Sequence, residues 1–166
     1  MILLEFLGVK IAGKTWDQSI VLPAPNAPTQ TVIDELLLTA ITERPEAFGE
    51  IVQQHQNFQL CWQLLLNINA ASHPATFFLM KLAARVGELT MISLKRRHPT
   101  YPRPSQVCPT LYPPVPVPGH SSYPAGHAII GHLTSACLAE LVPAHEDALI
   151  ALATRVGRNR VIAALH

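Results

Sequence analysis

Three short stretches of this 166-residue chain carry residue types that bind oxyanions. The first is a cationic cluster, Lys95–Arg97, followed by Arg103 in the adjoining segment. Guanidinium and ammonium groups that meet at one point attract phosphate-like anions. One cation at a helix end is usually structural, because it complements the helix dipole. Four cations between positions 95 and 103 instead favour an anion site.

The second stretch is Pro124-Ala125-Gly126-His127, in which His127 opens an apolar segment with helical spacing. The free N–H groups and the positive dipole end of such a helix favour an oxyanion. Gly126 permits close approach to the backbone. His127 could act as a general acid, because the ordinary pKa of histidine, about 6.5, lets it hold or release a proton near neutrality.

The third stretch ends the sequence, with Asn159-Arg160 followed by His166. We expect a helix from Pro143 towards the end of the chain, with one face made of Ala148, Leu152, Arg155, Asn159, Ile162 and His166. Arginines 155, 158 and 160 resemble a solvated basic face, which is the usual meaning of such a run. Alone, they do not indicate a function.

The elements that position these stretches are predicted to be helical, in one domain over residues 1–166. We expect an extended arm over 1–28, helices over 29–97, a proline-rich loop over 98–125 and helices over 126–166. The helix before the cationic cluster should bury Phe78, Leu82, Val86, Leu89 and Ile92, which recur at steps of three and four. The fold class is therefore all-α.

Composition excludes several classes of protein. A hydrophobic content of 49% supplies material for a buried core, and the net charge of +1 gives no basic field for a nucleic acid partner. Since no uninterrupted run of about eighteen apolar residues occurs, we expect no membrane span. The N-terminus lacks the pattern of a secretory signal, which predicts a cytoplasmic protein and leaves a mature secreted chain as the alternative. The spacing of the three cysteines does not match that of a metal site, so we expect each to be a small buried residue.

Together, the three stretches resemble a known signature. The superfamily of type 2 phosphatidic acid phosphatases, bacterial class A acid phosphatases and vanadium-dependent haloperoxidases carries K-x6-R-P, then P-S-G-H, then S-R-x5-H-x3-D. Arg103-Pro104 matches the end of the first motif, 124–127 matches the second with one change, and Asn159-Arg160 with His166 matches the third. The resemblance covers roughly residues 75–166 and implies a helical-bundle core.

This resemblance implies roles for individual residues. In the phosphatases, a histidine like His166 attacks phosphorus to form a phosphohistidine, and one like His127 protonates the leaving alcohol. Cations like Arg103 and Arg160 hold the phosphoryl oxygens, and no cofactor is needed. In the haloperoxidases, vanadate occupies the same place and is bonded to the histidine that corresponds to His166. A small oxyanion or phosphate ester is the expected partner.

The sequence departs from the signature at several positions. Lys95 lies one residue too far from Arg103, whereas Arg96 has the right spacing but the wrong identity, so either could supply the first cation. Ala125 replaces a serine and removes a hydrogen bond worth roughly 0.5–1.5 kcal/mol. The aspartate expected four positions after His166 is absent from the sequence, which predicts either a missing C-terminal segment or a weakened enzyme.

Three functions therefore stay open. They are a phosphatase-like hydrolase, a vanadate-dependent haloperoxidase and a non-catalytic anion-binding protein. We also expect exposed apolar helix faces, covered by a homodimer partner or by the missing segment.

Overall fold

The computed structural model describes residues 5–6 and 8–166, and these residues are mostly helical. In chain order, its elements are β1 (Lys10–Ile11), β2 (Lys14–Thr15), α2 (Trp16–Ser19), α3 (Gln30–Thr42), α4 (Arg44–Asn57), α5 (Leu60–Leu66), α6 (Pro74–Lys95), α7 (Pro104–Val107), η1 (Pro109–Leu111), α8 (Gly126–Ala139), η2 (Pro143–His145) and α9 (Glu146–Ile162). The predicted all-α class is confirmed, with one two-stranded antiparallel hairpin added. Within the described ranges, every helix is too short or too polar to cross a membrane.

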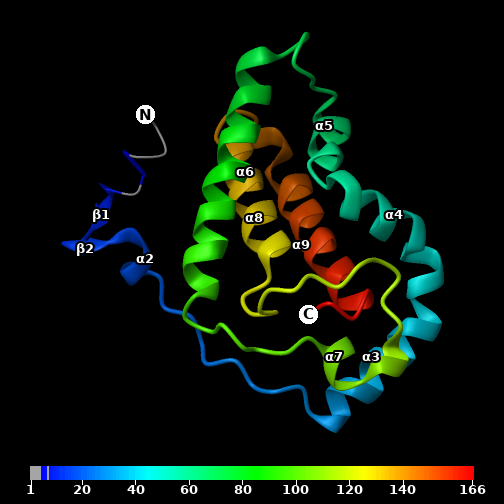
Figure 1. Cartoon of the computed structure of the whole chain (residues 1–166). Helices are drawn as coiled ribbons and strands as arrows, with labels where there is room; N and C mark the ends of the chain where they lie inside the picture. The colour runs from blue at the N-terminus through cyan, green and yellow to red at the C-terminus, as the bar shows by residue number, and fades with distance from the viewer. Residues whose placement is uncertain (1–4, 7) are drawn as a thin grey trace.

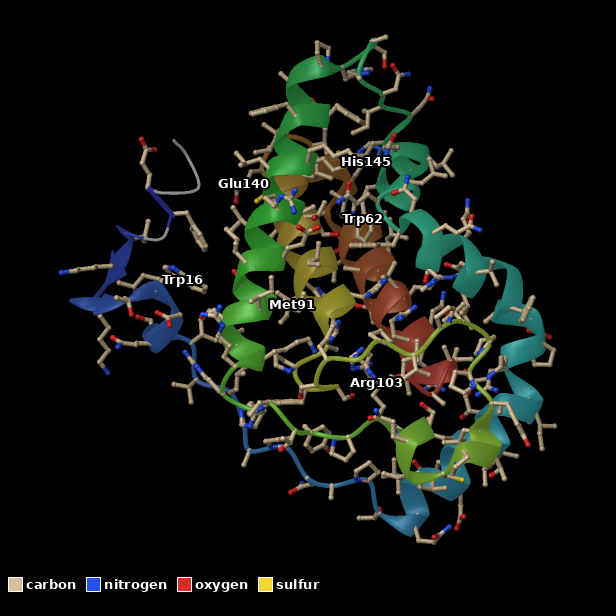
Figure 2. The ribbon with its side chains drawn as sticks, viewed as in Figure 1. Trp16, Trp62, Met91, Arg103, Glu140 and His145 are labelled. Carbon is tan, nitrogen blue, oxygen red and sulfur yellow. The ribbon has the colours of Figure 1, made fainter. Side chains whose placement is uncertain are left out.

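Three long helices form the centre of the molecule, with α8 packed between α6 and α9 (Figure 1). Helices α6 and α8 approach closely because Gly87 has no side chain. A Cβ atom there would lie 3.0 Å from the Cα atom of Ile130. The indole of Trp62, labelled in Figure 2, donates a 2.8 Å hydrogen bond to the Ser135 hydroxyl. The main core consists of Trp62, Ile68, Met80, Leu138, Leu149, Ala153 and Val156.

The buried face of α6 differs from the predicted one. Phe78 and Ile92 are exposed, although their spacing placed them on the expected apolar stripe. The face that contacts the core instead carries Met80, Ala83, Ala84, Gly87, Thr90 and Leu94. Small residues there let the backbone of α8 come close, and such packing outweighs the larger apolar area of the neighbouring stripe.

A second layer, α3 and α4, covers α9 and the residues that follow it (Figure 1). Ile51 packs in one cluster with Ile162 and Leu165, and Ile33 packs in another with Ala164. The segment after α9 is thus buried on the side of α3 and α4. This packing fixes the backbone that leads to His166.

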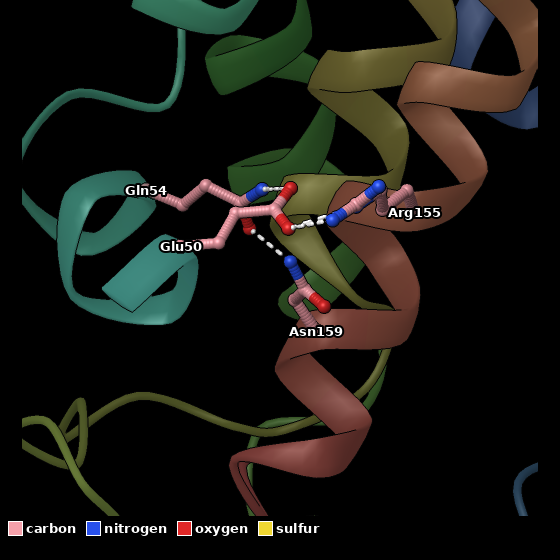
Figure 3. A network of polar contacts seen from close by, with 4 residues as sticks. All are labelled: Glu50, Gln54, Arg155 and Asn159. Carbon is pink, nitrogen blue, oxygen red and sulfur yellow. Dashed lines mark hydrogen bonds and ion pairs between the residues drawn. The ribbon is translucent and has the colours of Figure 1, made fainter. Parts of the chain in front are cut away.

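Polar side chains also join α4 to α9 (Figure 3). Glu50 forms an ion pair with Arg155, with 2.6 Å between Oε2 and Nη2. Asn159 donates from Nδ2 to Oε1 of Gln54 at 3.1 Å, and Gln54 donates to Glu50 at 2.7 Å. Because Gln54 and Asn159 are buried, these bonds satisfy groups that would otherwise be costly to desolvate.

Two predicted helices have different bounds. The helix expected to run to about Asn69 is divided into α4 and α5, where Phe58 packs against the rings of Trp62 and His127. Its second part ends at Leu66 and is capped by Asn67, whose φ of 50° is a left-handed conformation that asparagine tolerates. The last helix begins at Glu146, after the 3-10 turn η2, and ends at Ile162 before the end of the chain.

The N-terminal arm agrees in part with the prediction. Over residues 20–29 it is extended, but residues 10–19 form the hairpin and α2, and residues 1–4 and 7 lie outside the described part. Trp16 is buried against Phe6, with 4.7 Å between ring centroids. Arg97 donates to the backbone carbonyls of Asp17 and Ile20, which attaches the arm to the end of α6.

The proline-rich segment 98–125 is a loop, as predicted, with two short helical turns, α7 and η1. It passes below α6, α8 and the end of α9, so that Arg103 lies close to the C-terminal segment (Figures 1 and 2). Figure 2 also shows Met91 on α6 above this loop.

Candidate oxyanion site

A cavity of about 340 Å³ lies where α6, α8, the loop and the end of the chain meet. Five of the seven predicted site residues line it, namely Arg103, Gly126, His127, Arg160 and His166. They come from three segments that are far apart in the sequence. The convergence of these segments on one cavity is what the three motifs together require.

Arg103 supplies a buried cation on the loop side of the cavity. Only 1% of the residue is exposed, and its Nη1 donates a 2.6 Å hydrogen bond to the carbonyl of Leu165. Nε donates to Pro118, and Nη2 donates to the carbonyl of His120. Nη1 carries two N–H groups, and the bond to Leu165 uses one of them. Burial lowers the pKa of Arg103 below its ordinary value.

Arg160 supplies the second buried cation, from the last turns of α9. Only 3% of it is exposed, and its Nε and Nη1 atoms have no hydrogen-bond partner among the described residues. Burial, followed by the charge of Arg103, lowers its pKa to about 10, so it is still charged at neutral pH. A buried guanidinium without acceptors is energetically costly, and an anion in the cavity would supply the acceptors.

The suggestion of a solvated basic face is therefore wrong for Arg160 and correct for its neighbours. Arg155 and Arg158 are exposed and form ion pairs with Glu50 and Glu43. The buried face of α9 consists of Leu149, Ala153, Val156, Asn159, Arg160 and Ile162, whereas Ala148 and Arg155 of the predicted face are exposed. Arg160 continues an apolar stripe at steps of three and four residues, and that spacing is the signal that could have identified it.

His127 lies in the first turn of α8, with its ring 4.7 Å from that of Phe58, centroid to centroid. Burial lowers its pKa to about 3, and the charges of Arg160, His55 and Arg103 act in the same direction. The backbone carbonyl of Gln54 acts against them. Without an anion the imidazole is therefore neutral at pH 7. A bound anion would raise this pKa, because a nearby negative charge favours the protonated ring.

His166 reaches the cavity because of the way α9 ends. Ala164 adopts a left-handed conformation, with φ of 56°, and the N–H of Leu165 bonds the carbonyl of Arg160 at 3.0 Å. This is a Schellman motif, which reverses the chain direction after the helix. The Nδ1 atom of His166 lies 3.2 Å from the Ser122 hydroxyl. Burial lowers the pKa of His166 to about 3, and the charges of Arg103, Lys95 and Arg160 and the nearby His127 add to this effect.

The remaining two predicted residues do not line the cavity. Lys95 is buried, and its Nζ donates to three backbone carbonyls: Ser121 at 2.6 Å, Ser122 at 3.1 Å and Pro124 at 2.7 Å. All three N–H groups of the ammonium are therefore used within the protein. Arg96 is exposed and does not line this cavity. The expectation that one of them binds the anion directly does not agree with this arrangement.

The sequence suggested that Gly126 lets a ligand approach the backbone, but the close neighbour of Gly126 is the side chain of Met91. A Cβ atom there would lie 3.0 Å from Cγ of Met91, so the missing side chain makes room for this methionine on the cavity wall. Other lining residues that the sequence did not indicate are Glu88, Ile92, Pro118, His120 and Ile130. Glu88, Met91 and Ile92 lie three and one positions apart along α6. A helical wheel of α6 would have placed these three residues on one face of the helix.

No model of a known protein family matches this sequence. The site is therefore interpreted from its own geometry and from the motifs it contains. Over residues 5–6 and 8–166, no group of three or more His, Cys, Asp and Glu side chains is arranged to hold a metal ion. The cavity instead combines two guanidinium groups, the imidazoles of His120, His127 and His166, and the start of a fourteen-residue helix. The Glu88 carboxylate also lines it and is paired with Arg85. This set of groups suits a tetrahedral oxyanion.

Proposed function

We propose that this protein is a phosphatase-like hydrolase that acts on phosphate monoesters through a phosphohistidine. The observation that carries the proposal is the buried guanidinium of Arg160. Two of its nitrogen atoms have no partner in the described part of the chain, and it shares a cavity with Arg103, His127 and His166. The resemblance to the type 2 phosphatidic acid phosphatase superfamily supports it, because these residues occupy the motif positions. The same resemblance supports a helical-bundle core of that type.

In this mechanism, the two arginines bind the phosphoryl oxygens and stabilise the charge that develops on them, which is the main requirement of phosphoryl transfer. The ring nitrogen of His166 that does not face Ser122, Nε2, attacks phosphorus. The bond from phosphorus to the ester oxygen breaks, and His127 donates a proton to the departing alcohol. Water then attacks the phosphohistidine while His127 accepts its proton, which releases inorganic phosphate and restores His166.

The lowered pKa values of both histidines fit this sequence of steps. A neutral His166 has the lone pair that a nucleophile needs. His127 is also neutral before substrate binds, so its proton must arrive with the substrate. A phosphate monoester has a second pKa of about 6, and its monoanion can deliver that proton to a ring whose pKa the bound anion has raised.

Hydrolysis of a chromogenic aryl phosphate tests the proposal, with His127→Ala and His166→Ala as the variants. The matched control is His132→Ala, because His132 lies on α8 as well but is exposed and does not line the cavity. We expect hydrolysis by the wild type and the control, loss in both site variants, and inhibition by vanadate. Equal rates in His166→Ala and wild type would contradict the proposal.

Two further assays separate the alternatives. Vanadate would be held by the same arginines and by His166, so peroxide-dependent bromination that appears only after vanadate is added would indicate a haloperoxidase. Phosphate or tungstate that raises the melting temperature without any turnover would indicate a non-catalytic anion-binding protein.

A further inference from the structure

Ser122 lies in direct contact with the proposed nucleophile. The residue is 3% exposed, and its hydroxyl oxygen lies 3.2 Å from Nδ1 of His166. The same hydroxyl donates to the backbone carbonyl of Leu165, also at 3.2 Å. A serine hydroxyl has one proton, and that proton is used in the bond to Leu165.

This arrangement favours one of the two tautomers of His166. When the hydroxyl donates to Leu165, it accepts from Nδ1, and Nδ1 is then the protonated nitrogen of the neutral ring. Nε2 then keeps its lone pair. The opposite tautomer would place a proton on the atom that has to attack phosphorus.

Lys95 holds Ser122 in place. Its ammonium group binds the carbonyls of Ser121, Ser122 and Pro124, and this fixes the backbone on both sides of the hydroxyl. The carbonyl of Leu165 is held in turn by Arg103, at 2.6 Å. Ser122 and its acceptor, the carbonyl of Leu165, are thus each held by a buried cation.

We propose that Ser122 is the positioning residue that sets the tautomer and orientation of His166, and that Lys95 acts through Ser122 and not by binding the anion. A hydroxyl fixes the tautomer without adding a negative charge, which agrees with a site built to receive an anion. The kinetic part of this inference rests on the proposed phosphatase function.

The test uses protein labelled with ¹⁵N in its histidines, and two-bond ¹H–¹⁵N correlations at pH 7. In the wild type, His166 should show a protonated Nδ1 and an unprotonated Nε2. Ser122→Ala should give a mixture of the two tautomers, whereas Ser121→Ala should keep the wild-type pattern. Ser121 is a matched control, since it is also buried and its hydroxyl donates to the carbonyl of Tyr123 and not to His166.

Kinetics supply a second readout. Ser122→Ala should lower kcat roughly 10- to 100-fold, the range typical of lost orienting contacts, with little change in KM because both arginines remain. Ser122→Thr keeps a hydroxyl and should restore part of the rate.

The two readouts separate this inference from the proposed function. If the wild type does not hydrolyse phosphate esters but its Nδ1 proton is lost in Ser122→Ala, Ser122 still positions His166 and only the phosphatase proposal fails. A protonated Nε2 in the wild type, or an unchanged tautomer in Ser122→Ala, would overturn the inference. If Ser122→Ala does not fold, the wild-type spectrum alone decides between the two tautomers.

Discussion

Arg103, in the proline-rich loop, donates from Nη1 to the carbonyl of Leu165, the residue before His166, at 2.6 Å. The same side chain also binds the carbonyls of Pro118 and His120. One buried guanidinium therefore closes the loop onto the end of the chain. Its charge and its hydrogen bonds serve both the cavity and the local fold.

Arg103→Lys should destabilise the protein although the charge is kept. Lysine lacks the planar fork of donors and would leave at least one of these partly buried carbonyls without its guanidinium partner, which costs about 1–3 kcal/mol in the free energy of unfolding. Urea denaturation measures this change. Arg96→Lys is the control, because Arg96 is exposed and its replacement should change stability by less than about 0.5 kcal/mol. Equal effects at both positions would contradict the role given to Arg103.

Arg160→Met should have opposite effects on stability and on anion binding. Without an anion, the substitution removes a buried charge whose Nε and Nη1 have no partners within residues 5–6 and 8–166. The protein should therefore become more stable, by about 1–3 kcal/mol. In the presence of phosphate or tungstate, the rise in melting temperature seen for the wild type should disappear.

Arg158→Met is the matched control for Arg160, since Arg158 lies on the same helix, is exposed and pairs with Glu43. It should keep the response to anions and lose at most about 1 kcal/mol. Differential scanning fluorimetry with and without tungstate gives both quantities. A strongly destabilised Arg160→Met that still responds to tungstate would show that Arg160 serves the fold and not the anion.

Acid should destabilise the protein through its two cavity histidines. Their pKa values are about 3 in the folded state and 6.5 in the unfolded state, so between these values the unfolded state binds more protons. Their contribution to stability is complete above pH 6.5 and is lost as the pH falls towards 3. Phosphate should reduce this loss, since an anion raises both folded-state pKa values.

Melting temperatures between pH 4 and pH 7 measure the effect. The His127→Gln/His166→Gln double variant should show a smaller fall over this range than the wild type. An identical fall in both proteins would assign acid sensitivity to the carboxylates and not to the cavity.

In the polar network between α4 and α9, the effects of replacing Gln54 and Asn159 on the free energy of unfolding should depend on each other (Figure 3). Asn159→Ala leaves Oε1 of Gln54 buried without its donor, which should cost about 1–3 kcal/mol. In a double-mutant cycle with Gln54→Ala, the two changes should be non-additive by at least about 0.5 kcal/mol. Additive effects would show that the bond between these amides contributes nothing.

Part of this arrangement could be predicted from the sequence. Proline positions and apolar spacing gave the helical class, the loop and the start of α8, because these depend on local backbone preferences. The order of the three motifs predicted that Arg103, His127 and Arg160 share one site. The motif order also predicted that His166 belongs to this site. The left-handed turn at Ala164, which directs His166 into the cavity, could not be predicted because the sequence has no glycine there.

The errors concern side-chain directions, which depend on tertiary packing. Lys95 has a cationic side chain at a helix end beside an anion motif, and nothing in its spacing shows that three carbonyls of the loop bind its ammonium group. The buried face of α6 was misassigned because small residues such as Gly87 pack closest to α8. Ser122 was not singled out, because a loop serine has no distinctive pattern.

The most direct test of the account is to trap the covalent intermediate. The protein is mixed with a phosphate monoester, quenched in alkali to preserve any phosphohistidine, and its peptides are analysed by mass spectrometry. We predict phosphate on the peptide that contains His166, and none on that peptide in His166→Ala. Turnover of the ester with no phosphate on His166 at any time after mixing would contradict the account.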